Sequence, residues 1–415
     1  MSEIEYALNT FYFLMTGALV MWMAAGFTML EAGLVRRRNT AEIVTKNIGL
    51  YSIACFMFLL CGYSVMYPST IVEGFIPPYD FSFGMREVES GMANGSHAKS
   101  SDFFFQVVFV ATAVSIVSGA VAERMNQWPF FALAAFIAGV IYPIQGFWNW
   151  GGGFLLTDYG YSDFAGSGTV HLAGGACALA AAIFVGPRVG KYGKVTGTNF
   201  GIFPKAKTNK LYGANIPIAA LGTFILWLGW FGFNGGSELK VSEVSSATAV
   251  SQVFLNTNMA AAGGVVAALL ISLFLSGKMD VTMAINGAIA GLVSITADPL
   301  SPSGGTAVIV GAIGGAIVYF SILFLEKSGI DDPVGAISAH GIVGIYGVLV
   351  VSATGGADFG GQLIGVLMIA GFTYVASLGV VYLINMFMPI RATDEEQMAG
   401  LDATEIGVEA YPEFD

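Results

Sequence analysis

The sequence predicts an all-α integral membrane protein, and three observations support this fold class. The chain of 415 residues is 55% hydrophobic and only 11% charged, whereas a soluble domain has roughly a quarter charged residues. Apolar stretches of about 20 residues, long enough to cross a bilayer, recur from end to end. They are too long and too uniformly apolar for barrel strands of about 10 alternating residues. A helix bundle therefore remains, because lipid requires every backbone polar group to be satisfied internally.

We predict eleven transmembrane helices. In chain order they cover 8–33, 41–66, 103–122, 128–149, 167–186, 212–236, 247–276, 280–298, 304–325, 335–353 and 359–389. Many of the 55 glycines stand at small-x-x-x-small spacing, which favours close helix packing in lipid. We expect residues 1–390 to form one transmembrane domain and 391–415 an acidic cytoplasmic tail.

The basic residues predict the orientation. All but three of the 17 Lys and Arg residues fall on one side of the eleven predicted spans. Because cytoplasmic loops carry the excess of Lys and Arg, we expect the N-terminus outside and the C-terminus in the cytoplasm.

One motif occurs twice. Residues 163–175 read "DFAGSGTVHLAGG" and residues 332–344 read "DPVGAISAHGIVG", with Asp, Gly, His and Gly at the same four places. These stretches fall on spans five and ten, and an offset of five spans inverts the orientation. The pattern predicts an inverted five-plus-five repeat, with halves at about 8–186 and 212–353 and span eleven outside it; such repeats place transport sites near the bilayer midplane.

The two repeated histidines are the strongest candidates for function. His171 and His340 each follow the motif Asp by eight residues, about 12 Å along a helix, so both reach the middle of the membrane from opposite faces. Ionisable side chains there line pathways or pair with one another. Two histidines without nearby Cys or carboxylate ligands make a poor metal site, and no nucleophile accompanies them. The pair suits a neutral solute that needs hydrogen bonds, or a proton relay, and we predict no enzyme, metal or cofactor.

Aromatic residues gather at the outer ends of three predicted spans. Phe109 lies on span three, Trp148 and Trp150 end span four, and Phe233 stands four residues before Ser237 on span six. One interpretation is an interfacial aromatic belt. The other is a vestibule that attracts a small cation through cation–π contacts.

Several blocks together resemble a known family. "AAGFTMLEAGLVRRRN", "IVSGAVAER", "DFAGSGTVH", "GWFGFNGGS" and "DDPVGAISAHG" are similar, in order and across essentially the whole chain, to the signature blocks of the Amt/Mep/Rh ammonium transporters. The bacterial and archaeal Amt branch is more similar than the Rh branch. The resemblance implies a multi-pass homotrimer of the plasma or inner membrane that takes up ammonium, with a pore through each subunit, no cofactor and no nucleic-acid partner.

The resemblance also implies roles for single residues. Phe109, Trp150, Ser237 and Asp163 would form the outer ammonium site. Phe109 and Phe233 would be the gate, His171 and His340 the twin histidines of the pore, and Asp332 the inner counterpart of Asp163. The block "YPIQGFWNWGGG" departs from the family, which commonly has a His there. Trp148 therefore competes with Trp150, and we prefer Trp150.

The resemblance favours transport that carries charge, in which NH4+ is deprotonated outside, NH3 crosses, and the proton follows. Two alternatives stay open: an ammonium sensor with the same fold, and an Rh-like channel for NH3 or CO2. The tail resembles the cytoplasmic tail of Amt transporters, and this resemblance implies that the tail and the basic loop 188–210 together form a docking surface for a PII-type regulatory protein.

Overall fold

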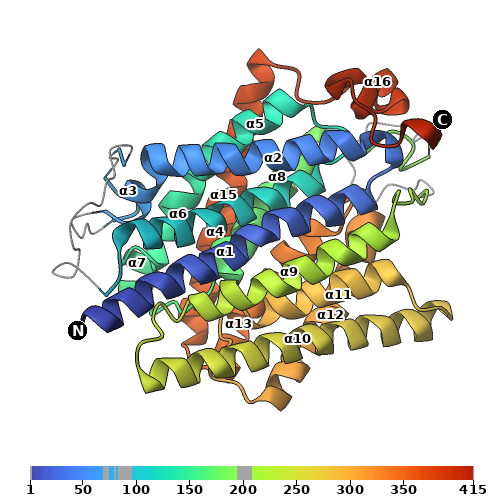
Figure 1. Cartoon of the computed structure of the whole chain (residues 1–415). Coiled ribbons are helices and arrows are strands. Elements are labelled where there is room, and N and C mark those ends of the chain that lie inside the picture. Colours follow the sequence, from blue (N-terminus) through green and yellow to red (C-terminus); the bar gives the residue numbers. More distant parts are fainter. Residues whose placement is uncertain (1, 69–73, 79–80, 83–95, 194–207, 415) are drawn as a thin grey trace.

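The chain forms a bundle of long helices in the computed structural model (Figure 1). The structure describes residues 2–68, 74–78, 81–82, 96–193 and 208–414. Within these ranges every regular element is helical, which confirms the prediction of an all-α fold. The two ends of the chain lie at opposite ends of the bundle (Figure 1).

The helices follow the predicted spans closely. The first half contains α1 (Glu3–Leu34), α2 (Thr40–Met57) with η2 (Phe58–Gly62) and α3 (Tyr63–Met66), α4 (Lys99–Ala120), α5 (Gln127–Phe136) with η4 (Ile137–Ile141) and α6 (Tyr142–Asn149), α7 (Phe154–Thr157), and η5 (Ser167–Leu172) with α8 (Ala173–Val185). The second half contains α9 (Ile216–Gly236), α10 (Val244–Ser276), α11 (Val281–Ile295), α12 (Gly304–Lys327), η6 (Ile337–Ile342) with α13 (Val343–Leu349) and α14 (Val351–Thr354), and α15 (Phe359–Phe387).

Ten continuous helices in the described ranges are long and apolar enough to cross a membrane, so this is a multi-pass membrane protein. The eighth predicted span, 280–298, corresponds to α11, which is apolar but has only 15 residues. At 1.5 Å per residue it is about 22 Å long, shorter than a hydrocarbon core of about 30 Å. The prediction of eleven spans therefore rests on this short helix.

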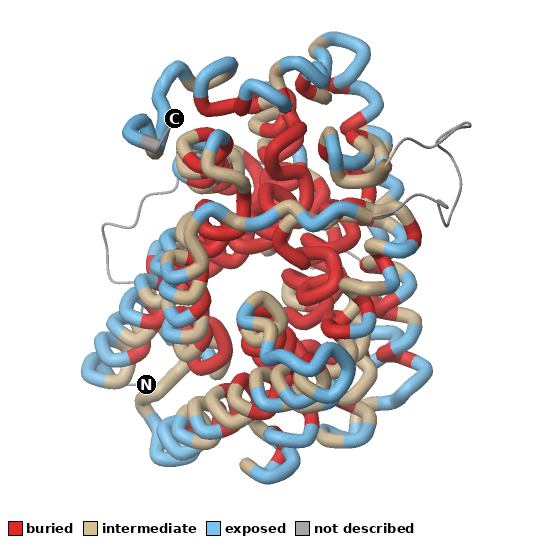
Figure 2. Tube along the Cα trace, turned by 90° about the vertical axis from the view of Figure 1, so that its right-hand side faces the viewer, coloured by how far each residue is buried: buried red, intermediate tan, exposed pale blue. Residues whose placement is uncertain are grey.

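The two halves of the sequence meet in the middle of the bundle. Helix α1 packs along α9, while η5 and α8 of the first half contact η6 and α13 of the second. Buried residues gather at the centre and exposed residues form the outer surface (Figure 2). The apolar window of α4 is 89% buried, whereas those of α10 and α15 are only 33% buried, and the rest of each window is partly or fully exposed. Such exposed apolar faces suit contact with lipid.

The repeated motif builds the same local structure twice. Gly166 and Gly335 both have left-handed backbone angles, with φ of 109° and 82°, which glycine adopts without steric cost. Each precedes a π-helical segment, η5 or η6, that carries a histidine. π-Helical turns are rare and frequently occur at functional sites.

The last motif glycine of each copy permits close approach. A Cβ atom on Gly175 would lie 2.3 Å from the Cα of Gly341, and one on Gly344 would lie 2.7 Å from the carbonyl oxygen of Ser167. Each copy thus leaves space for the histidine-bearing segment of the other, and this explains why glycine recurs at that place.

Buried charges hold one end of the bundle together, and we call it the basic end. Arg188 donates to Asp331 at 2.8 Å and to Glu123 at 2.6 Å, and Arg36 also pairs with Glu123. Burial alone would lower the pKa of Arg188, but the two carboxylates stabilise its charged guanidinium and raise this pKa. Burial alone would raise the pKa of Asp331, but the charge of Arg188 lowers it. The network joins segments that follow α1, α4 and α8 to the segment that precedes η6.

The acidic tail is folded against the basic end. It contains α16 (Asp394–Ala399), η7 (Asp402–Ile406) and η8 (Pro412–Phe414). Asp402 accepts a hydrogen bond of 2.8 Å from the backbone N–H of Glu42, and Glu405 accepts one of 2.5 Å from that of Gln127. Carboxylates are favourable near helix N-termini, so the tail's charge attaches it to α2 and α5. Residues 194–207 of the basic loop 188–210 lie outside the described residues.

Candidate functional site

The two repeated histidines meet in the core. Nδ1 of His340 lies 3.1 Å from Nδ1 of His171, and their rings stack with centroids 5.1 Å apart. His171 is fully buried and His340 is 2% exposed. A neutral imidazole has one donor and one acceptor nitrogen, so this contact holds a single proton and gives the two rings opposite tautomers. Within the described residues, Nε2 of His171 has no hydrogen-bond partner.

Aromatic rings continue from the pair toward the end of the bundle opposite to the basic end. Trp230 and Phe233 stack on His171 at centroid distances of 4.9 and 5.3 Å. Phe109 stacks on Phe233 at 4.1 Å. The edge contact of Trp150 with Phe109, at 6.0 Å, completes the series. Residues from the end of α6, α4 and α9 thus continue the line of rings from His171, and we call them the ring stack: Trp150, Phe109, Phe233 and Trp230.

The two candidate tryptophans have different surroundings. Trp148 is fully buried, packs against Phe372 at 5.0 Å, and donates through Nε1 to the carbonyl of Phe75 at 2.7 Å. Trp150 is partly exposed, touches Phe109, and donates through Nε1 to the carbonyl of Asp163 at 2.9 Å. The structure therefore places Trp150, and not Trp148, at the end of the ring stack farthest from the histidine pair.

Asp163 is built into the turn before η5. Its carboxylate accepts hydrogen bonds from the backbone N–H groups of Gly166, Gly168 and Thr169 and from the Thr169 hydroxyl, all between 2.8 and 3.0 Å. Burial raises the pKa of Asp163, and these hydrogen bonds oppose that shift. Asp163 thus orients η5 directly and supports Trp150 through its backbone carbonyl.

Ser237 ends α9 one turn beyond Phe233. Its hydroxyl donates to the carbonyl of Phe233 at 2.8 Å, so its oxygen lone pairs remain available as acceptors. Residues 233 and 237 lie on one helix face, and Ser237 is consequently on the side of the ring stack away from the histidines.

Asp332 repeats the capping role of Asp163 at the basic end. It accepts from the backbone N–H groups of Ala336 at 3.0 Å and Ile337 at 2.8 Å. Burial raises the pKa of Asp332 to about 6. The charge of Arg124 favours the ionised form of Asp332, and the Asp332 carboxylate is therefore coupled to the basic end.

Sequence reasoning missed two rings of the site. Trp230 stands three residues before Phe233 in "GWFGFNGGS", a spacing that shares a helix face and was a usable signal. Phe27 packs on the other histidine, His340, with centroids 6.0 Å apart. An apolar residue in an apolar helix carries no such signal.

The fold and site define the class of protein: a multi-pass helical membrane protein with a histidine pair buried where two sequence repeats meet, as in transporters built from inverted repeats. The chain belongs to the ammonium transporter family, because the family model, the Ammonium Transporter Family, matches residues 11–411. This confirms the resemblance of the motifs. Members named in this way are transporters, and the protein is not an enzyme.

Relatives and solved structures are similar over nearly the whole chain. Ammonium transporter Amt2 of Archaeoglobus fulgidus is 36% identical, covering 99% of this chain and 89% of the relative. A putative ammonium transporter of Synechocystis is 35% identical, covering 98% and 90%. Among solved structures, a sensor Amt protein is 34% identical with a TM-score of 0.87, covering 98% of this chain and all of that one. Mep2 of Candida albicans is 26% identical with a TM-score of 0.79, covering 94% and 87%.

Proposed function

We propose that this protein transports ammonium by recruiting NH4+ at the outer end of the ring stack, removing a proton, and conducting NH3 past His171 and His340. The observation that carries the proposal is the unbroken line of rings from Trp150 through Phe109 and Phe233 to the histidine pair.

The proposal includes the orientation and the setting. The basic end faces the cytoplasm because Lys and Arg concentrate there, and the ring stack faces outside. Helix α11 completes eleven transmembrane helices of an inverted repeat, with a short span. Family membership supports a homotrimer in the plasma or inner membrane, and the folded acidic tail at the basic end offers a surface for a PII-type regulatory protein.

Selectivity follows from the dryness of the pore. Ammonium and potassium ions have the same charge and similar size, so cation–π attraction alone cannot separate them. Moving an unpaired ion into an apolar medium costs on the order of tens of kcal/mol, and the stacked, buried rings of Phe109 and Phe233 supply no opposite charge. Ammonium can lose its proton and enter as NH3, whereas potassium has no neutral form.

Each site residue then has a role. Trp150 and Phe109 attract the cation through their ring faces, and Ser237 offers hydroxyl lone pairs to its N–H groups. Asp163 is the nearby carboxylate that favours a cation at this end and orients η5. Phe109 and Phe233 part to admit NH3 and close again to exclude ions.

The histidine pair accepts and passes both ammonia and a proton. Because a single proton bridges the two Nδ1 atoms, the pair offers one donor and one acceptor Nε2, which suits NH3. When the proton removed outside binds the acceptor Nε2 of His171, the shared Nδ1 proton passes to His340, so that the positive charge moves from His171 to His340. We therefore propose that the proton removed outside follows NH3 along the pair, so that transport carries net charge.

A second candidate function is ammonium sensing. The similarity to a sensor Amt protein over its full length, with a TM-score of 0.87, favours this alternative specifically. An Rh-like channel for NH3 or CO2 is the third reading, and the outer cation site of Trp150, Phe109 and Ser237 argues against it.

One experiment separates the three. Purified protein in liposomes is given a pulse of ammonium while current and internal pH are recorded together. Current with rejection of potassium supports the proposed transporter. A pH change without current supports a gas channel, and the absence of both supports a sensor.

A further inference from the structure

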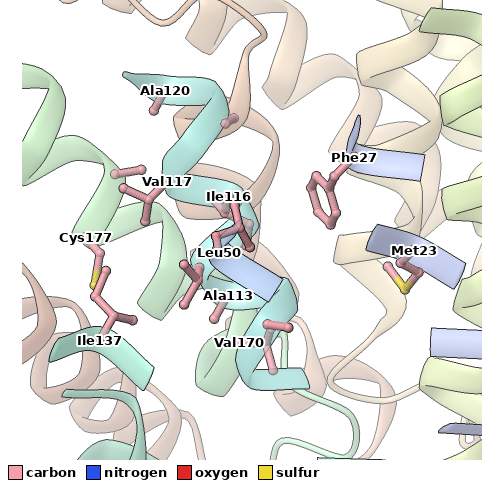
Figure 3. Close-up of a cluster of buried hydrophobic side chains, with 14 of the residues drawn as sticks. Met23, Phe27, Leu50, Ala113, Ile116, Val117, Ala120, Ile137, Val170 and Cys177 are labelled. Carbon is pink, nitrogen blue, oxygen red and sulfur yellow. The ribbon is translucent and has the colours of Figure 1, made fainter. Parts of the chain in front are cut away.

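A small cavity lies on the basic-end side of the histidine pair. Its volume is about 10 Å³, and His340, Phe27, Ser115, Asn286 and Glu31 are among its lining residues. A cavity of about 10–15 Å³ holds one water molecule, and ammonia is of similar size. Phe27 and Ile116, which face the same space from α1 and α4, are seen in Figure 3.

Glu31 is the acidic residue of this cavity. It lies on α1 one turn beyond Phe27, the ring that packs on His340, and it is 1% exposed. A buried carboxylate without a paired cation is costly, and intramembrane ionisable residues usually serve a pathway. Its position continues the line that runs from the ring stack through the histidines.

The charges around Glu31 do not neutralise it. Lys46 and Glu42 on α2 are the charged groups that influence it electrostatically, and these two pair with each other. The other elements packed against the carboxyl present neutral groups: Asn47 on α2, Ser118 on α4 and Asn286 on α11, with His340 on η6 across the cavity. No salt bridge to Glu31 occurs within the described residues.

The hydrogen bonds of Glu31 fit both of its protonation states. Oε1 lies 2.6 Å from the hydroxyl oxygen of Ser118, which also lies 2.7 Å from the carbonyl oxygen of Ser115. A hydroxyl has one hydrogen. If Ser118 donates to Glu31, it stabilises the ionised carboxylate; if Ser118 donates to Ser115, a protonated Glu31 can donate to Ser118. Turning one hydroxyl therefore accommodates the loss or gain of the proton.

We propose that Glu31 is the acid that returns a proton to ammonia on the inner side of the pore, and that the cavity beside it is an inner ammonium-binding site. The inference rests on the proposed transport function. Ammonia in the cavity uses its lone pair to take the proton of the Glu31 carboxyl, so the O–H bond breaks and a fourth N–H bond forms. The resulting carboxylate is the counter-ion of NH4+, and Phe27 offers a ring face.

The cycle closes without another reactant. NH4+ leaves to the cytoplasm, and the carboxylate regains a proton from the imidazolium of His340, which carries the proton removed outside. The imidazole is then neutral again, and the sum is one NH4+ moved inward. Glu31 thus separates the passage of NH3 through the apolar pore from the release of NH4+ to the cytoplasm.

The test uses the full-length protein in liposomes and the variants Glu31→Gln and Glu31→Asp. Glutamine has the same shape and keeps both neighbours, because its oxygen accepts from Asn47 and its NH2 donates to Ser118. The control is Glu326→Gln, an acid of the same membrane side that pairs with Lys191 away from the cavity. We expect Glu31→Gln to reduce the ammonium flux at least tenfold without changing the half-saturating external concentration. Glu31→Asp retains part of the flux, and the control behaves as wild type.

Infrared difference spectra detect the protonation state of the Glu31 carboxyl group. A purely structural role of Glu31 would not change this signal when ammonium is added. Addition of ammonium to wild type is expected to remove the carbonyl band of a protonated carboxyl group. The change is absent in Glu31→Gln, present at a shifted frequency in Glu31→Asp, and unaltered in the control.

The outcomes separate the inference from the function on which it rests. A wild type without flux refutes the proposed transport. Wild-type flux together with an unchanged flux in Glu31→Gln, or with the same infrared change in that variant, refutes the role of Glu31. If Glu31→Gln fails to assemble, the flux and the infrared spectrum of Glu31→Asp decide instead. A wild-type spectrum in which ammonium causes no change of the carboxyl band overturns the inference.

Discussion

Adding one methyl group at Gly175 is expected to pull the histidine pair apart. In Gly175→Ala the new Cβ would lie 2.3 Å from the Cα and 2.4 Å from the nitrogen of Gly341. Carbon atoms pack at about 3.5–4.0 Å, and both neighbours are backbone atoms that cannot rotate away. The segment that carries His340 must therefore move by about 1 Å or more. The Nδ1 contact of 3.1 Å then lengthens to about 4 Å, beyond the range of a hydrogen bond.

The magnitude has two parts. Inserting a methyl group into a packed core costs about 1–3 kcal/mol, which we expect as a lower melting temperature of the purified protein. Loss of the shared proton is expected to reduce ammonium flux into liposomes at least tenfold. Gly379→Ala is the matched control, because this glycine is also helical, on α15, and a Cβ there meets nothing within 4 Å. A Gly175→Ala protein with the flux and melting temperature of wild type would refute the reasoning.

Three further predictions concern the ring stack, the pair and the basic end. His171→Ala and His340→Ala are each expected to abolish selective transport or let potassium leak; ammonium-selective currents in both would exclude the pair from the pathway. Trp150→Ala is expected to raise the half-saturating ammonium concentration about thirtyfold, since a desolvated cation–π contact is worth about 2 kcal/mol. Trp148→Ala is instead expected to cost about 3–5 kcal/mol of stability. If Trp148→Ala weakened ammonium binding and Trp150→Ala lowered the melting temperature, the outer site would have to be assigned to Trp148. Arg188→Ala removes the salt-bridge partner of the buried Asp331 and leaves Glu123 paired with Arg36 alone, so we expect a loss of about 3–5 kcal/mol in denaturation experiments; an unchanged melting temperature contradicts this.

Much of the fold was predictable because a helix that crosses a membrane needs a continuous apolar stretch of about 20 residues. The ends of the spans were less so: 280–298 is helical only over Val281–Ile295, since Asp280 caps the helix by accepting from the backbone N–H of Thr282. The tail, predicted as an acidic cytoplasmic segment, folds back because carboxylates such as Asp402 find the N-terminus of α2. That pairing depends on three-dimensional proximity, which composition does not report.

The pairing of the histidines was predictable for a different reason. Symmetric spacing of His171 and His340 placed them at one depth, and the contact between their Nδ1 atoms agrees with that prediction. The π-helical turns that aim the rings were not predictable, because they depend on close approach at Gly175 and Gly344. Glu31 was visible as a lone acid in the apolar run "FTMLEAGL", yet only its burial beside a cavity distinguishes it from an acid at a helix end.

The symmetry of the scaffold also limits where direction can arise. Exchanging the two repeats interchanges Asp163 with Asp332 and His171 with His340, and each Asp caps the turn before the segment that carries its histidine. Among the described residues, the ring stack contacts His171, while Phe27 and the Glu31 cavity adjoin His340. Changes at motif positions should therefore slow ammonium movement in both directions. Changes in the ring stack should alter the apparent affinity for ammonium on the outer side alone, and changes at Glu31 should alter the release of ammonium on the inner side alone. Flux measurements from each face of the membrane can distinguish these effects.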